Sequence, residues 1–410
     1  NGGWRDGVRT VARTDPAHPS TVVAEVSLAG RDVAGAAVDA ARAAFPAWRA
    51  TPAPSRGEIL RRAADLVERR AADIGRDLTR EEGKTIAEAI GETRRAVAIL
   101  RYYAGQTMEP DGETYPSQTP NFLLYSRREP LGVVTAITPW NFPIALPAWK
   151  IAPALAYGNT VVWKPAELVP LTAVHLVQAF VEAGLPAGVL NLVLGSGAEI
   201  GDVLITHPDV DAITFTGSNP TGRAIQAKAT AMGKRVQLEM GGKNPAIVLA
   251  DADLDFAAEQ VARGAFLSAG QKCTATSRVI VERTALAGIT ERLAHHARSW
   301  KVGDPLAAET VVGPLVSEER LRSVLGYLEV AVVDGGRLLA GGGRAAGIGE
   351  GHFVQPTVFT AVPASSRASR EEIFGPVAIV TPADSYAEAL AIANDTPFGL
   401  SASLFTRDLG

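Results

Sequence analysis

The spacing of apolar residues changes along the chain and predicts different secondary structure in successive regions. Residues 31–105 are rich in alanine, arginine and glutamate, and around 60–67 apolar residues recur every three or four positions. This spacing is typical of amphipathic helices. Between 112 and 130, turn-forming residues precede a short apolar run at 122–125, which predicts a short strand.

From residue 131 onward, apolar runs of strand length alternate with helical stretches. The predicted strands are 133–138, 160–163, 189–194 and 212–216, and the predicted helices are 144–157, 171–183, 198–206 and 220–232. Continuous Val/Ile/Leu strands separated by helices indicate a parallel sheet that is covered on both faces. A doubly wound nucleotide-binding domain is therefore expected. The alternative is a layered α/β domain that binds no nucleotide.

A second α/β pattern begins near residue 243. Its predicted strands are 246–249, 278–282, 353–359 and 377–380, and its predicted helices are 254–267, 286–299 and 385–394. Two glycines, Gly241 and Gly242, follow a strand at the seam between the two patterns. Flexible glycines mark such boundaries, and domain seams are common places for ligand clefts.

Composition narrows the possible classes of function. A length of 410 residues corresponds to two or three domains. The 40 basic and 44 acidic side chains give a net charge of −4, without the basic excess of nucleic-acid-binding proteins. No apolar run reaches the roughly 18 to 20 residues of a membrane span, so no nucleic acid or membrane partner is expected. The start as given has no signal-peptide pattern.

Cys273 is the single cysteine of the chain. One thiol excludes an intrachain disulfide framework and a cysteine-rich zinc site, and it favours a reducing, cytoplasmic location. The six histidines form no spaced set, so no metal site is expected. The polar, Gly-bearing flanks of Cys273 and the neighbouring Lys272 fit a reactive thiolate. A buried structural cysteine is the alternative.

Two polar residues follow predicted strands near the expected cleft. Glu239 ends a strand just before the seam, where a carboxylate can act as general base on a water. Asn141 follows the first strand of the sheet between two prolines, and its amide could donate to a developing oxyanion. The alternatives are an ion-paired surface carboxylate for Glu239 and a helix cap for Asn141.

Two further segments suit a dinucleotide. Gly217 and Ser218 follow a strand and open a helix, where backbone amides and a hydroxyl can bind phosphate. The glycine spacing departs from the usual dinucleotide fingerprint. Lys164 and Glu167 end the strand after Asn141 and could hold the two hydroxyls of a ribose, although a surface ion pair explains them equally well. Glu167 would repel a 2′-phosphate and so favours NAD over NADP.

Six motifs occur together in a fixed order. They are TPWNFP at 138–143, WKPAE at 163–167, FTGS at 215–218, LEMGGKNP at 238–245, GQKC at 270–273 and EEIFGP at 371–376. On these motifs the chain resembles the aldehyde dehydrogenase superfamily. The resemblance implies an α/β fold with a doubly wound Rossmann-type cofactor domain, an α/β catalytic domain and a small β oligomerisation ribbon.

The resemblance also implies roles for individual residues. The implied catalytic residues are Cys273 as nucleophile, Glu239 as the base that activates water, Asn141 with the Cys273 backbone N–H as oxyanion hole, and Lys150 in proton relay. The implied residues for NAD or NADP are Thr138, Trp140, Lys164, Glu167, Gly217, Ser218, Glu372 and Phe374. An aldehyde would then be oxidised through a thiohemiacetal and a thioester, and Glu239 favours hydrolysis of the thioester over transfer to coenzyme A.

Within the superfamily, segments 130–170 and 270–278 look most like α-ketoglutaric semialdehyde (2,5-dioxopentanoate) dehydrogenases. Succinate semialdehyde and glyceraldehyde 3-phosphate are alternative substrates. A family member that binds ligand without turnover, and a cysteine hydrolase without redox chemistry, are the other hypotheses.

The expected domain division follows the motifs. Residues 1–111 and 131–240 are assigned to the NAD(P)-binding domain, 112–130 to the oligomerisation ribbon and 241–410 to the catalytic domain. In the family, a further segment that pairs with a neighbouring subunit follows a point like Gly410. A homodimer or homotetramer is expected where that segment is present.

Overall fold

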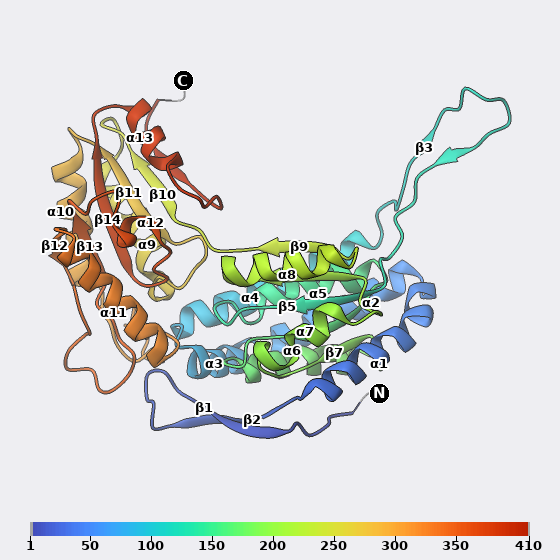
Figure 1. Cartoon of the computed structure of the whole chain (residues 1–410). Helices are drawn as coiled ribbons and strands as arrows, with labels where there is room; N and C mark the ends of the chain where they lie inside the picture. The colour runs from blue at the N-terminus through green and yellow to red at the C-terminus, as the bar shows by residue number, and fades with distance from the viewer. Residues whose placement is uncertain (1–2, 409–410) are drawn as a thin grey trace. The chain divides into compact units, whose positions relative to one another are not determined.

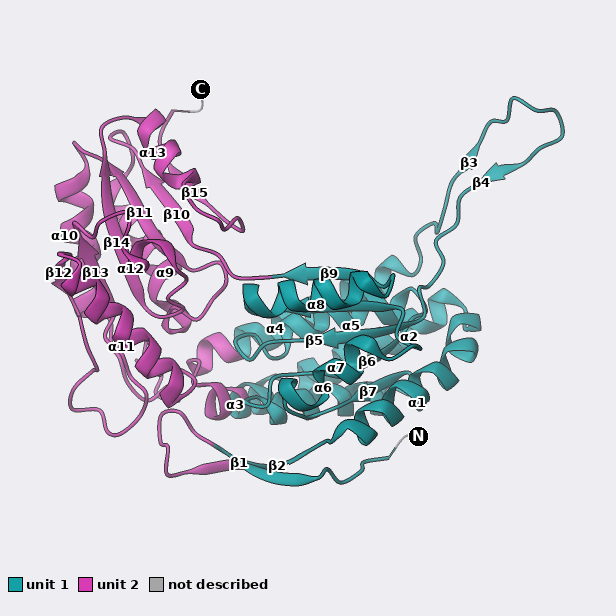
Figure 2. Ribbon diagram, viewed as in Figure 1, with its two compact units in different colours: residues 1–13, 24–77, 90–239 teal, residues 14–23, 78–89, 240–410 magenta. Residues whose placement is uncertain are grey.

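The computed structural model describes residues 3–408, which form two compact units (Figure 1 and Figure 2). Unit 1 contains the described residues up to 13 together with 24–77 and 90–239, and unit 2 contains 14–23, 78–89 and the described residues from 240. The chain passes from one unit to the other five times, so neither unit is a continuous stretch of sequence.

The N-terminal region contains a strand pair, four helices and a ribbon. They are β1 (Arg9–Thr14), β2 (Val22–Leu28), α1 (Arg31–Ala50), α2 (Ala53–Arg69), α3 (Ala71–Glu82), α4 (Ile86–Gln106), β3 (Thr114–Tyr115) and β4 (Leu124–Tyr125). The four helices confirm the helical pattern expected for 31–105. The antiparallel β3 and β4 project from unit 1 as a ribbon (Figure 1).

Unit 1 is built around a five-stranded parallel sheet. Its strands are β5 (Val133–Ile137), β6 (Thr160–Lys164), β7 (Leu190–Leu192), β8 (Ala212–Thr216) and β9 (Arg235–Glu239), and its helices are α5 (Ala145–Ala156), α6 (Pro170–Glu182), α7 (Gly197–Thr206) and α8 (Asn219–Ala231). The order is β7-β6-β5-β8-β9. Counted along the sheet this is 3-2-1-4-5, the Rossmann order, so the predicted doubly wound domain is confirmed.

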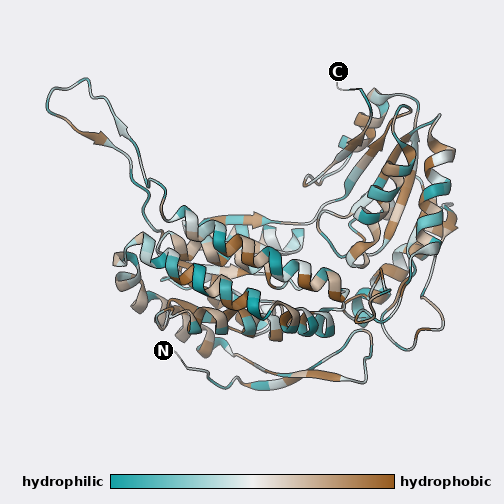
Figure 3. Cartoon of the chain, turned by 180° about the vertical axis from the view of Figure 1, so that it is seen from behind, coloured by the Kyte–Doolittle hydropathy of each residue, from teal (hydrophilic) through white to brown (hydrophobic). Residues whose placement is uncertain are grey.

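Strand order and burial explain where polar residues can gather in unit 1. β5 and β6 are almost entirely buried, as expected for strands with helices on both faces. The order reverses between β5 and β8, which pair with each other in parallel. Ligands of doubly wound sheets bind outside the carboxyl ends of the strands at such a switch point. Figure 3 shows hydrophilic and hydrophobic residues alternating along the surrounding helices.

Unit 2 is a second α/β unit with a six-stranded, mostly parallel sheet. Its elements are β10 (Asn244–Val248), α9 (Leu254–Phe266), the 3-10 turn η1 (Leu267–Gly270), β11 (Thr276–Glu282), α10 (Leu286–Ser299), α11 (Glu318–Val333), β12 (Arg337–Ala340), β13 (Thr357–Thr360), α12 (Arg367–Arg370), β14 (Val377–Ala383), α13 (Tyr386–Asn394) and β15 (Ser403–Phe405). The order is β12-β13-β14-β11-β10-β15, and only β12 pairs antiparallel within it.

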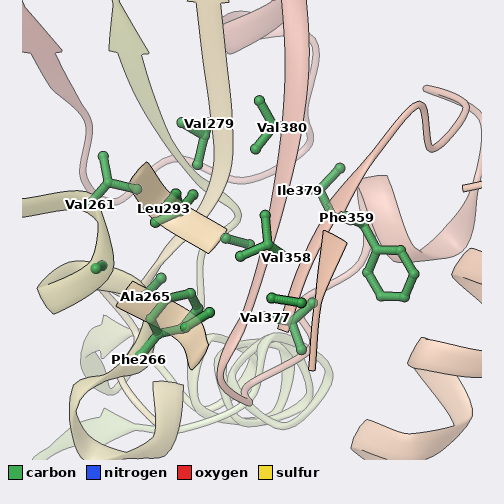
Figure 4. Packing of buried hydrophobic residues seen from close by; sticks show 14 of the residues in the cluster. Val261, Ala265, Phe266, Val279, Leu293, Val358, Phe359, Val377, Ile379 and Val380 are labelled. Carbon is green, nitrogen blue, oxygen red and sulfur yellow. The ribbon is translucent and has the colours of Figure 1, made fainter. Parts of the chain in front are cut away.

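The core of unit 2 forms where helices α9 and α10 cover the sheet. Phe266 and Val261 from α9 lie beside Leu293 from α10, and the side chains of Val279 and Val380 come from neighbouring strands (Figure 4). All five are buried, with at most 1% of their surface exposed. This packing holds Phe266, the last residue of α9, directly before the η1 segment, which leads to Cys273.

The structure differs from the sequence-based elements in several places. The strand expected at 353–359 occurs as Thr357–Thr360, because Val354 instead forms an isolated bridge with Arg344. The pattern did not predict β1, β2, β3, β12, β15, α11 or α12. Segments 14–23 and 78–89, expected in the first domain, pack with unit 2 instead. Backbone contacts such as those of Ile86 with Pro305 and His352 with Pro16 hold them there.

Candidate active site

The predicted site residues are distributed over both units. Unit 1 carries Thr138, Trp140, Asn141, Lys150, Lys164, Glu167, Gly217, Ser218 and Glu239, and unit 2 carries Cys273, Glu372 and Phe374. Each group is described within its own unit.

In unit 2, Cys273 follows a turn with an unusual backbone. Ser268 and Ala269 have φ angles of 56° and 51°, and Gly270 has φ of 69°. Left-handed backbone costs a non-glycine residue roughly 1–2 kcal/mol. At Gly270 a side chain is also excluded, because an added Cβ would lie 2.1 Å from the carbonyl oxygen of Gly375. Contacts from elsewhere in the unit must therefore stabilise this turn.

One such contact comes from Glu88 on α4. Its Oε1 accepts hydrogen bonds from the backbone N–H (2.7 Å) and hydroxyl (3.0 Å) of Ser268. Its Oε2 accepts from the hydroxyl of Thr85 at 2.8 Å, just before the helix begins. Thr85 and Glu88 have the spacing of a capping box. One carboxylate therefore caps the start of α4 and also holds the strained turn before Cys273.

A second contact comes from Asn244 at the start of β10. Its side-chain amide donates to the carbonyl oxygens of Cys273 (2.7 Å) and Ala275 (3.0 Å). The side-chain oxygen Oδ1 of Asn244 accepts a hydrogen bond from the backbone N–H of Ser401 at 3.1 Å. Asn244 is buried, so these bonds are shielded from competing water. The backbone of the predicted nucleophile is thus held from both sides.

Lys272 precedes Cys273 and is directed into the protein. Its Nζ donates to the carbonyl oxygen of Arg263 at 3.0 Å. Burial lowers the pKa of Lys272 to about 8, opposed by the negative charge of Glu88. A lysine poised between charged and neutral forms therefore lies next to the predicted nucleophile along the chain.

In unit 1, Asn141 lies in the turn between β5 and α5 and is 4% exposed. The helix cap considered as its alternative role is filled by another residue. Glu92 Oε1 accepts from the backbone N–H groups of Ile144 (3.0 Å) and Ala145 (3.1 Å), which open α5. The Ile144 cap position makes no side-chain bond of its own. These contacts assign the first backbone N–H groups of α5 to Glu92.

Lys150 is buried in α5, with 7% of its surface exposed, whereas an isolated lysine would ordinarily be exposed. Its Nζ donates to Thr214 Oγ1 at 2.9 Å and Gln237 Oε1 at 3.2 Å. Gln237 in turn donates from Nε2 to Glu239 Oε1 at 3.0 Å. Burial lowers the pKa of Lys150 to about 8, with Glu239 opposing the shift. A hydrogen-bonded chain therefore joins Lys150 to the exposed Glu239.

The predicted dinucleotide residues of unit 1 gather around the switch point. Thr138 follows β5 and its hydroxyl accepts a hydrogen bond from Trp163 Nε1 at 2.9 Å. Lys164 ends β6 and is buried, which lowers the pKa of its amino group against the effect of Glu167. Ser218 is the cap residue of α8, after β8. A cation, a carboxylate and a helix N-terminus therefore follow the carboxyl ends of these strands. Together they suit a phosphorylated, ribose-containing ligand.

In unit 2, Glu372 and Phe374 lie in an irregular segment before β14. Glu372 Oε1 accepts from the backbone N–H of Gly242 at 3.1 Å. Burial raises the pKa of Glu372, while this bond and the cations Arg320 and Lys243 oppose the rise. Phe374 has φ of 56°, again a left-handed non-glycine residue. This segment therefore also depends on contacts from its surroundings.

Sequence reasoning missed the residues that hold the predicted site in place. These are Glu88, Glu92, Asn244, Gln237 and Arg320. The Thr85-x-x-Glu88 spacing was a readable capping signal, and Asn244 lay inside a quoted motif. The long-range partners of Glu92, Gln237 and Arg320 left no local signal, because those contacts join segments distant in sequence.

One cavity of unit 1 is separate from these residues. Its volume is about 870 Å³, and it is lined by α1, α6, β7 and the segment 3–7. None of the predicted site residues lines it.

Within residues 3–408, no three His, Cys, Asp or Glu side chains form a group that could hold a metal. In the same range no helix is long and apolar enough to cross a membrane.

Known proteins match the chain over nearly its whole length. The family model described as "Aldehyde dehydrogenase family" matches residues 4–410. An alpha-ketoglutaric semialdehyde dehydrogenase of Bacillus subtilis is 47% identical over 97% of this chain and 82% of its own length. The crystal structure of Staphylococcus aureus betaine aldehyde dehydrogenase with NAD+ is 35% identical with a TM-score of 0.97, covering 100% of this chain and 82% of that one. An Escherichia coli structure titled as an NADP dependent enzyme has 38% identity and a TM-score of 0.97, covering 100% and 85%.

These matches agree with the motifs and the fold. The family that the motifs resemble is the family whose model matches the chain, and the solved structures match its fold with TM-scores of 0.97. The expected fold class, enzyme class and use of NAD or NADP are confirmed. The chain belongs to the aldehyde dehydrogenase family.

Proposed function

We propose that this aldehyde dehydrogenase oxidises its substrate through Cys273, with Asn141, Glu239 and Lys150 in supporting roles. The observation that carries the proposal is the fastening of the Cys273 backbone by Asn244 on a turn held by Glu88. A nucleophile needs such fixed geometry, because misplacement by about 1 Å can cost a hundredfold in rate.

The first step is addition of the Cys273 thiolate to the aldehyde carbon, which forms a C–S bond and an oxyanion. The Asn141 amide and the backbone N–H of Cys273 donate to that oxygen; one such donor is typically worth about 3–4 kcal/mol. Asn141 is suited to this role because Glu92 caps α5 instead. Oxidation of the resulting thiohemiacetal to a thioester removes a hydride from the substrate carbon, and a bound dinucleotide would supply the acceptor for that hydride.

Glu239 then removes a proton from water, which attacks the thioester and releases the carboxylic acid and the Cys273 thiolate. Gln237 donates to Glu239 and accepts from Lys150, so this hydrogen-bonded chain orients the Glu239 carboxylate and couples its charge to Lys150. A lysine with a pKa of about 8 can accept a proton near neutral pH when it is in its neutral form. Hydrolysis, and not transfer to coenzyme A, is the expected outcome.

The residues present fit a dinucleotide. Lys164, Glu167 and Ser218 at the switch point would hold the ribose and phosphates. Thr138, Trp140 and Gly217 also follow the carboxyl ends of these strands and would line the same site. Glu372 and Phe374 would hold the nicotinamide end. The acidic Glu167 supports NAD over NADP, because a carboxylate repels a 2′-phosphate.

The proposed substrate is 2,5-dioxopentanoate. Its support is the name of the Bacillus subtilis relative, which acts on alpha-ketoglutaric semialdehyde and is 47% identical. Succinate semialdehyde and glyceraldehyde 3-phosphate are the competing aldehydes. The single free cysteine supports action in a reducing compartment such as the cytoplasm.

The proposed assembly is a homodimer or homotetramer that uses the β3–β4 ribbon. Five of its large apolar side chains are exposed: Tyr115, Phe122, Leu123, Leu124 and Tyr125. An exposed strand edge with apolar side chains is a template for pairing with another chain. The occupant we propose is a second copy of this protein.

A spectrophotometric screen tests the reaction and the substrate together. The three aldehydes are each supplied with NAD+ or NADP+, and formation of the reduced cofactor is recorded. The expected result is the highest kcat/KM for 2,5-dioxopentanoate with NAD+. Cys273→Ser should abolish turnover and leave NADH binding intact. Turnover unchanged in Cys273→Ser would rule out the mechanism, and ester hydrolysis without any redox activity would identify a hydrolase.

A further inference from the structure

The segment between α12 and β14 carries two predicted cofactor residues, Glu372 and Phe374, but has no regular secondary structure. Glu371, at its start, accepts hydrogen bonds from the side chains of Arg367 (2.9 Å) and Tyr327 (2.7 Å). Glu372 is tied to the backbone of Gly242. The first part of the segment is therefore anchored before the chain reaches Phe374, whose backbone is left-handed.

Arg320 on α11 supports Phe374 in three ways. Its Nη2 donates to the carbonyl oxygen of Ile373 at 2.7 Å and makes a longer bond of 3.4 Å to that of Phe374. The guanidinium carbon lies 5.7 Å from the centroid of the Phe374 ring, within cation–π range. One planar group thus contacts both the backbone and the ring of the same residue.

The same helix holds the segment by close packing one turn further on. An added Cβ on Gly375 would lie 2.6 Å from the Val324 side chain of α11. On the opposite side, the carbonyl oxygen of Gly375 lies so close to Gly270 that a side chain there would collide with it. The segment is therefore confined between α11 and the turn that leads to Cys273.

A lysine could not reproduce these contacts. A guanidinium is rigid and planar, so it can donate in its plane while its face lies on an aromatic ring, whereas an ammonium is a point charge on a flexible stem. The Nε of Arg320 is buried and makes no hydrogen bond with any described residue. The side chain keeps this arrangement although one donor is left unpaired, which indicates that the ring and carbonyl contacts decide its position.

We propose that Arg320 is a positioning residue that fixes the Phe374 ring and its left-handed backbone for the nicotinamide end of the dinucleotide. This inference rests on the proposed function, because Phe374 matters only if it contacts the cofactor. Its consequence is selective: steps that need the dinucleotide depend on Arg320, and thiol chemistry at Cys273 without dinucleotide does not.

The test compares Arg320→Met, Arg320→Lys and the control Arg322→Met. Arg322 is on the same helix, but its side chain is 77% exposed and pairs with Glu318. Three measurements are made on each protein: kcat for 2,5-dioxopentanoate with NAD+, the Kd of NADH by fluorescence, and hydrolysis of p-nitrophenyl acetate without dinucleotide. Thermal melting confirms that each variant is folded.

Arg320→Met should lower kcat at least tenfold and raise the Kd of NADH at least threefold, with ester hydrolysis within twofold of wild type. Arg320→Lys should fold normally and show a smaller loss of the same kind, and Arg322→Met should match wild type in all three. The proposal is overturned if the Arg320 variants have the same kcat and the same Kd of NADH as Arg322→Met. It is also overturned if ester hydrolysis in Arg320→Met falls as much as kcat does.

The failure of the proposed function has a different signature. If the wild-type protein binds NADH but oxidises none of the aldehydes, the proposed function fails, while the NADH Kd of Arg320→Met still decides the role of Arg320. A wild-type protein that neither binds NADH nor oxidises an aldehyde overturns both proposals.

Discussion

At the scale of single residues, the candidate site depends on buried and half-buried polar side chains that take no part in the chemistry. Asn244, Glu88, Glu92 and Arg320 each satisfy backbone groups in turns that carry a predicted site residue. A buried donor or acceptor left without its partner costs about 1–3 kcal/mol. These positions should therefore affect both stability and the geometry of the site.

Asn244→Ala removes two donors from the carbonyl oxygens of Cys273 and Ala275. The free energy of unfolding should fall by about 1–3 kcal/mol, as measured by urea denaturation. Alkylation by iodoacetamide, which reports Cys273 alone because it is the single cysteine, should change in rate severalfold. Asn191→Ala is the control, since Asn191 donates to the carbonyl oxygens of Gly188 and Val161 in unit 1. It should lower stability without altering alkylation; equal alkylation rates in the wild type and the Asn244 variant would contradict this role.

The lowered pKa of the buried Lys150 should make the free energy of unfolding depend on pH. Its folded pKa is about 8, below the ordinary value of about 10.4, so between these values the unfolded state binds more protons. Stability from this group therefore rises with pH above 8, by up to about 1.4 kcal/mol per pH unit. In Lys150→Met, the slope of unfolding free energy between pH 8 and 9.5 should be smaller by about that amount. The exposed Lys228→Met should keep the wild-type slope, and the same slope in all three proteins would refute a neutral, buried Lys150.

At the scale of elements, Glu88 shows how one helix end can support a turn distant in sequence. Its carboxylate completes the capping box of α4 and also binds Ser268. A second pair with this spacing, Ser385 and Glu388 at the start of α13, lies in the same unit: Ser385 Oγ accepts from the N–H of Glu388, and the Glu388 carboxylate accepts from the N–H of Asp384. The two helices provide a matched pair, because only the first has the additional contact with the turn.

Glu88→Ala should lower the free energy of unfolding by about 2–4 kcal/mol, the sum of a lost cap and an unpaired buried N–H. Glu388→Ala should cost only about 1 kcal/mol. The rate of Cys273 alkylation should change in the Glu88 variant alone, because only that variant loses the hydrogen bonds to Ser268 in the turn before Cys273. If both variants lose the same stability and leave alkylation unchanged, Glu88 acts as a cap and nothing more.

The local spacing of apolar and polar residues was sufficient to predict most of the helices and strands. The continuous apolar strands β5, β6 and β8 and the helix α10 occur within about a residue of their expected bounds. The short strands β12 and β15 were missed because a run of three or four residues has too little periodicity to detect. The helix α11 was missed although its buried residues are spaced helically, and with it Arg320, the residue on which the further inference depends.

At the scale of the whole molecule, motif order identified the family, but the residues that support the site could not be predicted. Cys273 and Asn141 lie in motifs that can be read one at a time. Their supports Glu88 and Glu92 lie 185 and 49 positions away in the numbering, and only the folded chain brings them to the turns they hold. A single sequence carries no signal for such pairs.

The β3–β4 ribbon predicts the behaviour of the molecule in solution. Leu123 is 74% exposed, so Leu123→Lys should leave the unfolding free energy within about 0.5 kcal/mol of wild type. The mass measured by light scattering at micromolar concentration should fall, because a charge in an apolar interface opposes association. Val333→Lys, at an equally exposed apolar residue of α11 (84%), should keep the wild-type mass. A ribbon variant with the wild-type mass would exclude the ribbon as the interface.

The division of each unit into separate stretches of sequence affects how the protein can fold during synthesis. Segments 14–23 and 78–89 belong to unit 2, but the remainder of that unit starts only at Met240. At about 5–20 residues per second, a ribosome needs roughly 8 to 30 s to add residues 90–239. Throughout that time Glu88 has been synthesised but Ser268, its partner, has not, so the turn that carries the nucleophile is among the last parts of the enzyme to form.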